Sequence, residues 1–411
     1  MGRTIEQNLE GLRGVAAFMV VFGHIFFYTQ YMDPAYPLSL PGKYLPPGHF
    51  SVLIFFCLSG FVIGHTNRNP LAGSKDIGNY LLKRFVRLYP IYLLSILVIL
   101  PMVFTADSHG WKVLLEHLTF TNIPFGEIYF QNNPLWSLNY EVLYYLLFIP
   151  LSYFNFPKGK AIICALILAV LNAYFHTRFN FPLITSYLLG YVFWLTGLKI
   201  SEYTLVKEPN ELVPLKVLSL YLLAFALPAF ISFTGAEKAF ASLEPSKEIP
   251  WVHRAIGFSD LFILPYCAVF LLLLTNTALK YRQIFVAILY VTPVVCALVL
   301  MAKGGDRERL IVPLILYGLS LLFLLLSYRS QNAMKRPLDA IIYSGGISYA
   351  VYAFHFPILV LFGAMSFFSG TLVYALVRFV VYVFVVIVVS IIVEKRLQPL
   401  VKRIFVKSPR G

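Results

Sequence analysis

The chain has 411 residues, of which 59% are hydrophobic and only 13% are charged, and its mean hydropathy is +0.76. Because a soluble domain averages about 45–50% apolar and about 25% charged residues, this composition excludes a soluble protein and predicts an all-α integral membrane protein. The formal net charge of +14 is spread over short loops, so we interpret it as a signal of topology and expect no nucleic-acid partner.

Twelve apolar segments qualify as candidate transmembrane helices, and we expect a polytopic bundle of about 10–12 of them. The candidates are residues 12–31, 51–66, 88–106, 136–156, 161–176, 182–200, 214–234, 260–278, 284–302, 311–328, 343–367 and 371–393. With the N-terminus inside, the inner segments contain 23 Lys and Arg residues and the outer segments nine, which predicts that both termini are cytoplasmic. We expect residues 1–400 to form one transmembrane domain and residues 401–411 a basic cytoplasmic tail.

The first span, Leu9–Tyr28, contains two ionisable side chains, Arg13 at its start and His24 in its middle. At about 100° per residue, their spacing puts both on one helix face with a rise of about 16 Å, roughly half of a hydrocarbon core. Ionisable groups inside a membrane are costly and usually functional, so the pair predicts a site. The alternative is structural: an interfacial anchor arginine and a packed histidine.

The second span contains the sequence Phe55-Phe56-Cys57-Leu58-Ser59-Gly60-Phe61. Ser59 and Gly60 are small enough to let two helices approach closely, and we favour this packing role for Ser59 over a catalytic one. The cysteines of the chain all lie in apolar runs without the spacing of a metal site or a disulfide framework, so we expect small buried side chains and no metal. They are Cys57, Cys164, Cys267 and Cys296.

A basic segment, Lys83-Arg84-Phe85-Val86-Arg87-Leu88-Tyr89-Pro90, opens the third span from the cytoplasmic side. On a helix, Arg84 and Arg87 are neighbours, and two guanidinium groups suit the oxygens of a phosphate. The segment therefore predicts a site for a phosphate-bearing cytosolic donor, with Lys83 adding charge. The alternative is an anchor that contacts anionic lipid.

The fourth span opens with Pro134-Leu135-Trp136-Ser137-Leu138-Asn139-Tyr140-Glu141. Trp136 suits the outer membrane interface, and Glu141 lies about 7–8 Å deeper. A carboxylate at this depth is costly unless it is paired or hydrated. Glu141 can orient a histidine, pair with an arginine or hold an acceptor hydroxyl; a structural ion pair is the alternative.

Near the end, the segment Gly346-Ile347-Ser348-Tyr349-Ala350-Val351-Tyr352-Ala353-Phe354-His355-Phe356-Pro357 carries a second histidine at mid-span depth. We favour a hydrogen-bonded packing role for His355 over a catalytic one. Arg378 is the one basic residue within the last predicted span, where it either snorkels to the interface or pairs with a carboxylate.

Five of these segments, in this order along the chain, resemble the motifs of the membrane acyltransferase-3 family. The motifs are a basic residue, ten others and a histidine (Arg13, His24), then Phe-Phe-x-x-Ser-Gly-Phe, Arg-x-x-Arg-x-x-Pro, Trp-Ser-Leu-x-x-Glu and Ser-Tyr-x-x-Tyr-x-x-His. The chain departs from the family in carrying Glu10 where Asp is usual, and the family more often has ten spans. We expect no appended hydrolase-like domain of the kind that some relatives carry.

The resemblance implies an enzyme that transfers an acyl group, usually acetyl, from cytosolic acyl-coenzyme A to a hydroxyl group. The acceptor would be a cell-envelope carbohydrate, such as a surface polysaccharide or a lipid-linked sugar. The implied location is the bacterial inner (cytoplasmic) membrane, with membrane lipids as surroundings and acetyl-coenzyme A as the acyl donor.

Roles for the site residues follow as hypotheses. His24 acts as general base toward the acceptor hydroxyl or, in a variant, carries the acyl group as a nucleophile. Arg13 stabilises donor phosphate or developing negative charge, and Glu141 orients His24 or the acceptor. The remaining candidates bind the donor phosphates (Lys83, Arg84 and Arg87) or support substrate and structure (Ser59, Trp136, Ser137 and His355).

Two other classes of protein remain as alternatives. A transporter or flippase of an envelope sugar or lipid would also have many spans and few ionisable groups in the membrane, but the chain lacks an internal repeat. A non-catalytic partner of an acyltransferase complex would not need both Arg13 and His24.

Overall fold

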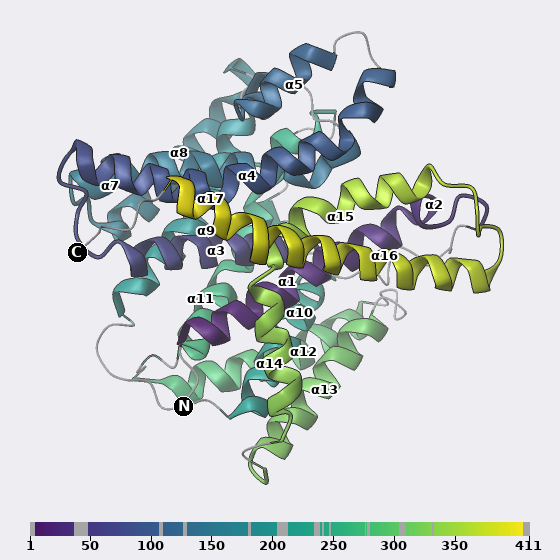
Figure 1. The fold of residues 1–411 in the computed structure, drawn as a ribbon. Helices are drawn as coiled ribbons and strands as arrows, with labels where there is room; N and C mark the ends of the chain where they lie inside the picture. The colour runs from purple at the N-terminus through teal and green to yellow at the C-terminus, as the bar shows by residue number, and fades with distance from the viewer. Residues whose placement is uncertain are drawn as a thin grey trace. The chain divides into compact units, whose positions relative to one another are not determined.

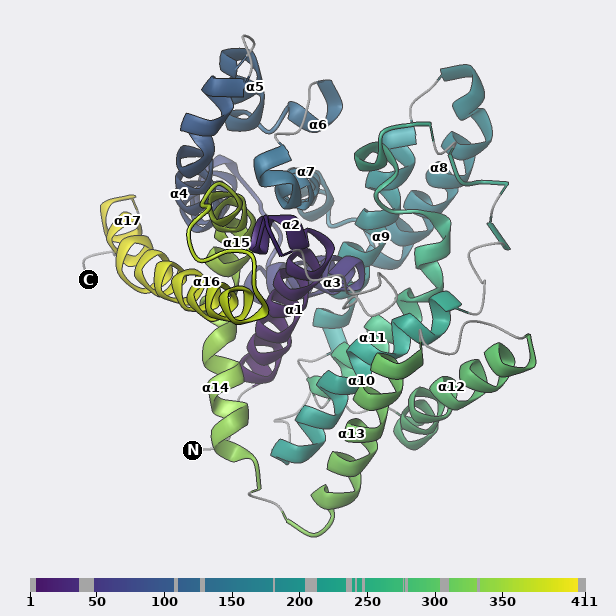
Figure 2. The same ribbon diagram turned by 90° about the vertical axis from the view of Figure 1, so that its right-hand side faces the viewer.

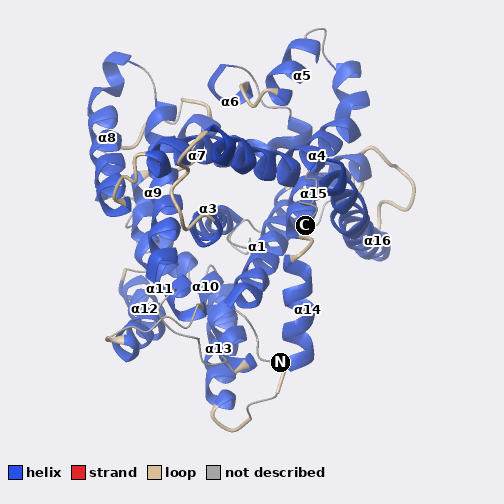
Figure 3. Cartoon of the chain, turned by 60° about the vertical axis from the view of Figure 1, so that its left-hand side comes forward, coloured by secondary structure: helices blue, strands red, loops and turns tan. Residues whose placement is uncertain are grey.

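The computed structural model describes residues 5–36, 48–106, 110–125, 130–179, 182–203, 213–233, 239–240, 242–245, 248–275, 277, 280–303, 310–330 and 333–405. Within these ranges every regular element is a helix, and Figure 3 shows no strand. The prediction of an all-α, polytopic membrane protein is confirmed. The chain divides into two compact units, residues 1–16, 46–68 and 156–345 in the first and residues 17–45, 69–155 and 346–411 in the second.

The first unit contains the start of α1 and most of the middle of the chain (Figure 1). Its elements are α1 (Ile5–Phe27, to residue 16), α3 (Gly48–Thr66), α8 (Lys158–Phe179), α9 (Pro182–Tyr203), α10 (Pro214–Phe233), η4 (Trp251–Arg254), η5 (Phe258–Phe262), α11 (Leu264–Leu274), α12 (Arg282–Ala302), α13 (Ile311–Ser327) and α14 (Lys335–Gly345). The helices α3 and α9 form its most extensive contact, and α10 packs against α13.

Two glycines allow α3 and α9 to approach closely. A Cβ atom at Gly60 would collide with the backbone carbonyl of Trp194, and one at Gly197 would collide with the carbonyl of Cys57. The hydroxyl of Ser59 accepts a hydrogen bond from the indole Nε1 of Trp194, 3.3 Å away. Small residues thus set the spacing of the two helices, as is usual where membrane helices pack.

The second unit contains the rest of α1 and the C-terminal helices. Its other elements are α2 (Thr29–Met32), α4 (Ser74–Ala106), α5 (Gly110–Leu118), α6 (Asn122–Phe125), η2 (Phe130–Leu135), α7 (Trp136–Tyr153), α15 (Ser348–Gly363), α16 (Leu372–Ile392), η7 (Val393–Leu397) and α17 (Gln398–Phe405). The helices α15 and α16 pack together as a hairpin, and α17 runs against α4 (Figure 2).

The turn of this hairpin is tied down by Arg378. Its guanidinium donates hydrogen bonds to four main-chain carbonyls, at Met32, Phe362, Met365 and Phe367, so neither snorkelling nor pairing with a carboxylate describes it. Its charge is thus satisfied by the dipoles of backbone carbonyl groups.

The carboxylate of Asp33 also stabilises the turn between α15 and α16. It accepts hydrogen bonds from the Ser369 hydroxyl and from the backbone amides of Ala35, Tyr36 and Gly370. Burial of Asp33 raises the pKa of its carboxyl group, but these hydrogen bonds outweigh burial and hold the pKa below its ordinary value.

The predicted spans and the observed helices agree in position and differ in extent. Each predicted span contains a helix, yet among the described residues only eight helices are long and apolar enough to cross a membrane, or ten if two bent pairs each count as one span. Ten is the lower end of the expected 10–12, and Ile311–Ser327 is a further apolar helix that is shorter than these. The bent pairs are Trp251–Phe262 with Leu264–Leu274 and Lys335–Gly345 with Ser348–Gly363.

Two details also depart from prediction. The helix of the third predicted span, α4, begins at Ser74 rather than at residue 88, so the whole basic segment lies inside it, where Arg84 and Arg87 are one turn apart as expected. Cys164 is exposed on α8, whereas Cys57, Cys267 and Cys296 are buried as expected; all four are free thiols.

Candidate functional site

Two histidines from distant parts of the chain meet in the second unit. His24 lies near the end of α1 and His355 in the middle of α15, and Nδ1 of His24 is 3.0 Å from Nε2 of His355. The rings are stacked, with centroids 5.1 Å apart. His355 is completely buried, and His24 is partly buried.

The backbone fixes which nitrogen of each ring carries a proton. Nδ1 of His355 lies 2.7 Å from the carbonyl oxygen of Tyr352 and 3.2 Å from that of Val351. A carbonyl only accepts hydrogen bonds, so Nδ1 is the protonated nitrogen and Nε2 of this neutral ring is an acceptor. His24 must then donate to it from Nδ1–H, which leaves Nε2 of His24 with its lone pair.

With its Nδ1–H donated to His355, His24 presents an unprotonated Nε2, which is the arrangement of a general base.

Aromatic and hydroxyl groups hold the pair in place. The ring of Phe356 meets His24 edge-on with centroids 5.4 Å apart, and Tyr28 lies on the same ring at 6.1 Å. The hydroxyl of Tyr352 is 2.8 Å from that of Ser137 and also donates to the carbonyl of Pro134. The start of α7 is thus fastened to the turn of α15 that precedes His355.

Trp136 and Glu141 lie on this same helix. Trp136 is buried, with its ring edge-on to Tyr140 at 5.1 Å. The carboxylate of Glu141 accepts a hydrogen bond of 2.5 Å from the hydroxyl of Tyr145, one turn later, and its charge also acts on the hydroxyl groups of Tyr349 and Tyr352. Orientation of His24 by Glu141 stays a prediction.

Arg84 lies between two aromatic rings. Its guanidinium carbon is 6.0 Å from the ring centroid of Tyr80 on α4 and 5.9 Å from that of Tyr145 on α7. Its buried Nε has no hydrogen-bond partner among the described residues. Lys83 is exposed beside it.

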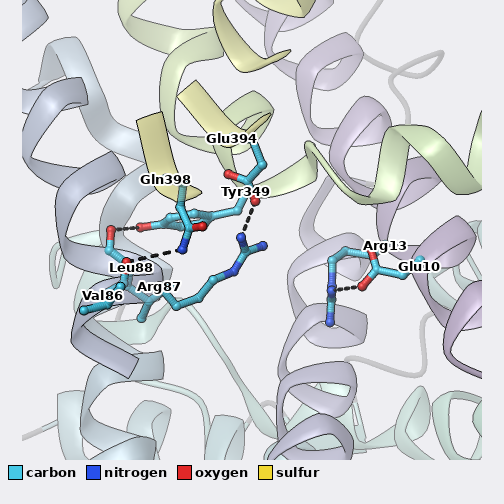
Figure 4. A network of polar contacts seen from close by, with 8 residues as sticks. All are labelled: Glu10, Arg13, Val86, Arg87, Leu88, Tyr349, Glu394 and Gln398. Atoms are coloured by element: carbon cyan, nitrogen blue, oxygen red, sulfur yellow. Dashed lines mark hydrogen bonds and ion pairs between the residues drawn. The ribbon is translucent and has the colours of Figure 1, made fainter. Parts of the chain in front are cut away.

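Arg87 is paired with a residue that the motifs did not single out. Its guanidinium forms an ion pair with the buried carboxylate of Glu394, and it lies over the ring of Tyr349 at 5.8 Å (Figure 4). The Tyr349 hydroxyl donates to the carbonyl of Leu88 at 2.9 Å. An isolated acidic residue after a long apolar run was the available signal in the sequence.

Arg13 and Ser59 belong to the first unit. Arg13 forms an ion pair of 2.5 Å with Glu10 on the preceding turn (Figure 4). Gly345 comes so close to the carbonyl of Glu10 that a Cβ atom would not fit there. Glu10 thus takes the place next to Arg13 where the family usually has Asp. The environment of Ser59 between α3 and α9 agrees with the packing role that we favoured.

A buried polar cluster lies between α5 and the start of α7. His117 of α5 is buried with its Nε2 3.5 Å from Asn122, and Asn139 of α7 donates to the carbonyl of Phe120 at 2.5 Å. Burial lowers the pKa of His117 to about 4, because a hydrogen bond to the Val113 carbonyl offsets only part of the cost of charging it. His117 is therefore neutral at pH 7.

Comparison with known proteins identifies the family. A family model described as an acyltransferase domain, acyltransferase-3, matches residues 6–296. "Acyltransferase MdmB" of Streptomyces mycarofaciens is 29% identical over 155 residues, which are 36% of this chain and 38% of the relative. "Protein 2 in picA locus" of Rhizobium radiobacter is 38% identical over 90 residues, 21% of this chain and 40% of the relative.

The matched segments span about two fifths of the length of these relatives, and no solved structure matches the chain. The family model covers well over half of the 411 residues and includes four of the five motifs, from Arg13 to Glu141. The helical fold, the long apolar helices and this match agree. The chain is a multi-pass membrane protein that belongs to the acyltransferase-3 family.

Proposed function

We propose that this protein is an O-acyltransferase of the bacterial cytoplasmic membrane that transfers an acyl group, acetyl in the first instance, from cytosolic acyl-coenzyme A to a hydroxyl group of an envelope carbohydrate. The observation that carries the proposal is the contact of His24 with His355, because it leaves Nε2 of His24 as an unprotonated base. Membership of the acyltransferase-3 family and the name of the Streptomyces relative, an acyltransferase, support acyl transfer in general.

In the proposed reaction, Nε2 of His24 removes the proton of the acceptor hydroxyl as its oxygen attacks the thioester carbonyl. A C–O bond forms, the C–S bond breaks, and the imidazolium returns the proton to the departing thiolate. The positive charge is transient and is shared with the stacked imidazole of His355. In the variant, Nε2 itself attacks the thioester carbonyl, a C–N bond forms, and the C–S bond breaks to release the thiolate of coenzyme A. The acceptor hydroxyl then attacks the acyl-imidazole, a C–O bond forms as the C–N bond breaks, and the hydroxyl proton passes to the released thiolate.

The donor side of the proposal rests on α4. The guanidinium of Arg84 lies between the rings of Tyr80 and Tyr145, and its Nε has no hydrogen-bond partner among the described residues. Lys83, the preceding residue, is exposed. Arg87 completes a basic cluster suited to the phosphates of coenzyme A. The role of Arg13, which belongs to the first unit, stays a prediction, and the cluster around His117 and Asn139 offers polar groups for a sugar acceptor.

The experiment uses the purified full-length protein in lipid nanodiscs with acetyl-coenzyme A labelled in the acetyl group. The acceptor source is an envelope fraction from cells that lack this protein. We expect label in the carbohydrate fraction and release of one free thiol for each acetyl group transferred. Label that stays on coenzyme A would contradict the proposal and favour a transporter, which transport of labelled sugars into vesicles would then reveal.

The identity of the acceptor follows from a comparison of glycans. Envelope carbohydrates from cells with and without the protein should differ in mass by one acyl unit on the modified sugar. The acyl unit found in this way also distinguishes acetyl from a longer chain. Identical glycan masses in the two strains would count against an envelope carbohydrate as acceptor.

A further inference from the structure

The last long helix of the chain changes its winding where it carries Glu394. Residues 393–397 form a π-helical turn between α16 and α17, and the helical path continues to residue 405. Short π-helical segments are rare overall, but many of those that occur lie at functional sites. The wider turn takes one extra residue, which changes the direction of the side chains that follow. The contacts that this turn makes possible are therefore candidates for a functional role.

The π-helical turn brings two polar side chains onto α4. Glu394 forms an ion pair with Arg87, and the amide of Gln398 donates to the carbonyl of Val86 at 3.4 Å (Figure 4). Both contacts bind the end of the last helix to the segment of α4 that carries the proposed donor site, and α17 packs against the same helix.

The two partners of the ion pair differ in exposure. The Glu394 side chain is 2% exposed, whereas that of Arg87 is 37% exposed. A buried carboxylate without a cation is strongly unfavourable, so Arg87 cannot leave Glu394 freely. One edge of the guanidinium is thus held against the buried carboxylate, while 37% of the Arg87 side-chain surface remains exposed.

The ring of Tyr349 fixes the remaining freedom of Arg87. It lies under the guanidinium at 5.8 Å, and its hydroxyl is bound to the Leu88 carbonyl at 2.9 Å. A planar guanidinium held at one edge and over one face keeps a single orientation, which is the condition for binding a phosphate with good geometry.

We propose that Glu394 is a positioning residue of the donor site: it holds the guanidinium of the partly exposed Arg87 in one orientation, in which Arg87 and Arg84 meet the phosphates of acyl-coenzyme A. This inference rests on the proposed function, and it adds to the proposed donor site a residue that lies far from Arg87 in the sequence. Glu394 acts on recognition of the phosphate-bearing part of the donor and not on the chemistry at the thioester.

The test compares two donors on the full-length protein in nanodiscs: acetyl-coenzyme A and S-acetyl-pantetheine, which has the same thioester and no phosphate. For Glu394→Gln we expect KM for acetyl-coenzyme A to rise about tenfold, the loss of one charge-assisted contact, with little change in kcat. KM for S-acetyl-pantetheine should not change. Glu394→Asp, which keeps the charge, should recover part of the loss.

A double variant guards against misfolding. Arg87→Gln with Glu394→Gln removes both charges and leaves no buried carboxylate without a partner, so it should fold like the wild type. We expect it to lose no more donor affinity than Arg87→Gln alone, because both changes act through the same guanidinium. Glu202→Gln is the matched control; Glu202 pairs with Lys158 and Lys199 in the first unit and should leave both KM values unchanged.

Equal losses for both donors in folded Glu394→Gln protein, or an unchanged KM for acetyl-coenzyme A, would overturn the inference. Equilibrium binding of coenzyme A itself separates this result from failure of the proposed function. If the wild type binds coenzyme A and the Glu394→Gln variant binds it about tenfold more weakly, the positioning role stands even where no acyl transfer is found. Equal binding by both proteins would reject it.

Discussion

At the scale of single residues, His355 determines which nitrogen of His24 is available for chemistry. Its own Nδ1 is committed to backbone carbonyls of α15, so only Nε2 faces His24. The prediction that His355 is chiefly a hydrogen-bonded packing residue captured its burial and missed its partner. Hydrophobic periodicity reports which side of one helix is apolar, and it cannot tell which residue 331 positions away will face that side.

Replacement of His355 tests this assignment. His355→Ala removes the acceptor for Nδ1–H of His24, and we expect kcat to fall about 10- to 100-fold with KM for the donor unchanged. His355→Gln should recover part of the rate, because its amide oxygen can accept the same hydrogen bond. Glu202→Gln, at a residue that pairs with Lys158 and Lys199 in the first unit, is the control and should leave kcat unchanged. A wild-type kcat in His355→Ala would contradict the account.

Arg84 gives a second prediction at this scale. Arg84→Gln should raise KM for acetyl-coenzyme A about tenfold and leave KM for S-acetyl-pantetheine unchanged, because only the first donor carries phosphates. Arg84→Lys should recover little, since an ammonium neither spans two oxygens nor stacks between Tyr80 and Tyr145 in the same way. The measurement is steady-state kinetics with each donor; a penalty of the same size for both would move the phosphate site elsewhere.

At the scale of elements, the apolar runs predicted where the helices lie, but they did not predict where each helix begins and ends. The residues from Ser74 to the predicted start of the span at residue 88 include polar and basic side chains that interrupt the apolar pattern. They therefore lay outside the predicted span, yet they form the first part of α4. The predicted span 343–367 is interrupted at Gly346 and Ile347, between α14 and α15. Composition alone does not separate a continuous span from a broken one.

The contact between α3 and α9 carries a prediction on stability. At Gly197 a methyl group would collide with the backbone of Cys57, which cannot move as a flexible side chain can. Gly197→Ala should therefore lower the free energy of unfolding by about 1–3 kcal/mol. Gly159→Ala, on α8 with open space around it, is the control and should be neutral or slightly stabilising. Thermal unfolding in detergent measures both; equal melting temperatures for the two variants would argue against close packing.

The turn between α15 and α16 carries a prediction on pH. Because hydrogen bonds hold the pKa of Asp33 below its ordinary value in the folded protein, its carboxylate stabilises the fold above the unfolded pKa, which is about 3.9. This contribution is lost as the pH falls through the folded pKa. Asp33→Asn should therefore lower the melting temperature at pH 7, and its difference from the wild type should narrow below about pH 4. A difference that does not depend on pH would exclude the ionised carboxylate as the cause.

At the scale of the whole molecule, the sequence predicted the fold class and the family, and the structure added the contacts that complete the site. The motif residues from Arg84 to His355 gather in the second unit because α4, α7 and α15 all belong to it, whereas Arg13 and Ser59 belong to the first. Glu394 was not singled out, because the basic residues that follow it were considered only as a sign of a cytoplasmic end. Both cytoplasmic termini and the extent of the basic tail stay predictions.

The measurement that tests the central claim most directly is the rate of acetyl transfer by purified His24→Gln protein beside the wild type, with acetyl-coenzyme A and the modified envelope acceptor. Size-exclusion chromatography and thermal unfolding establish that the variant is folded. The account predicts a rate lower by about 100- to 10,000-fold, because no other unprotonated nitrogen is held by His355. Transfer at the wild-type rate by folded His24→Gln protein would contradict it.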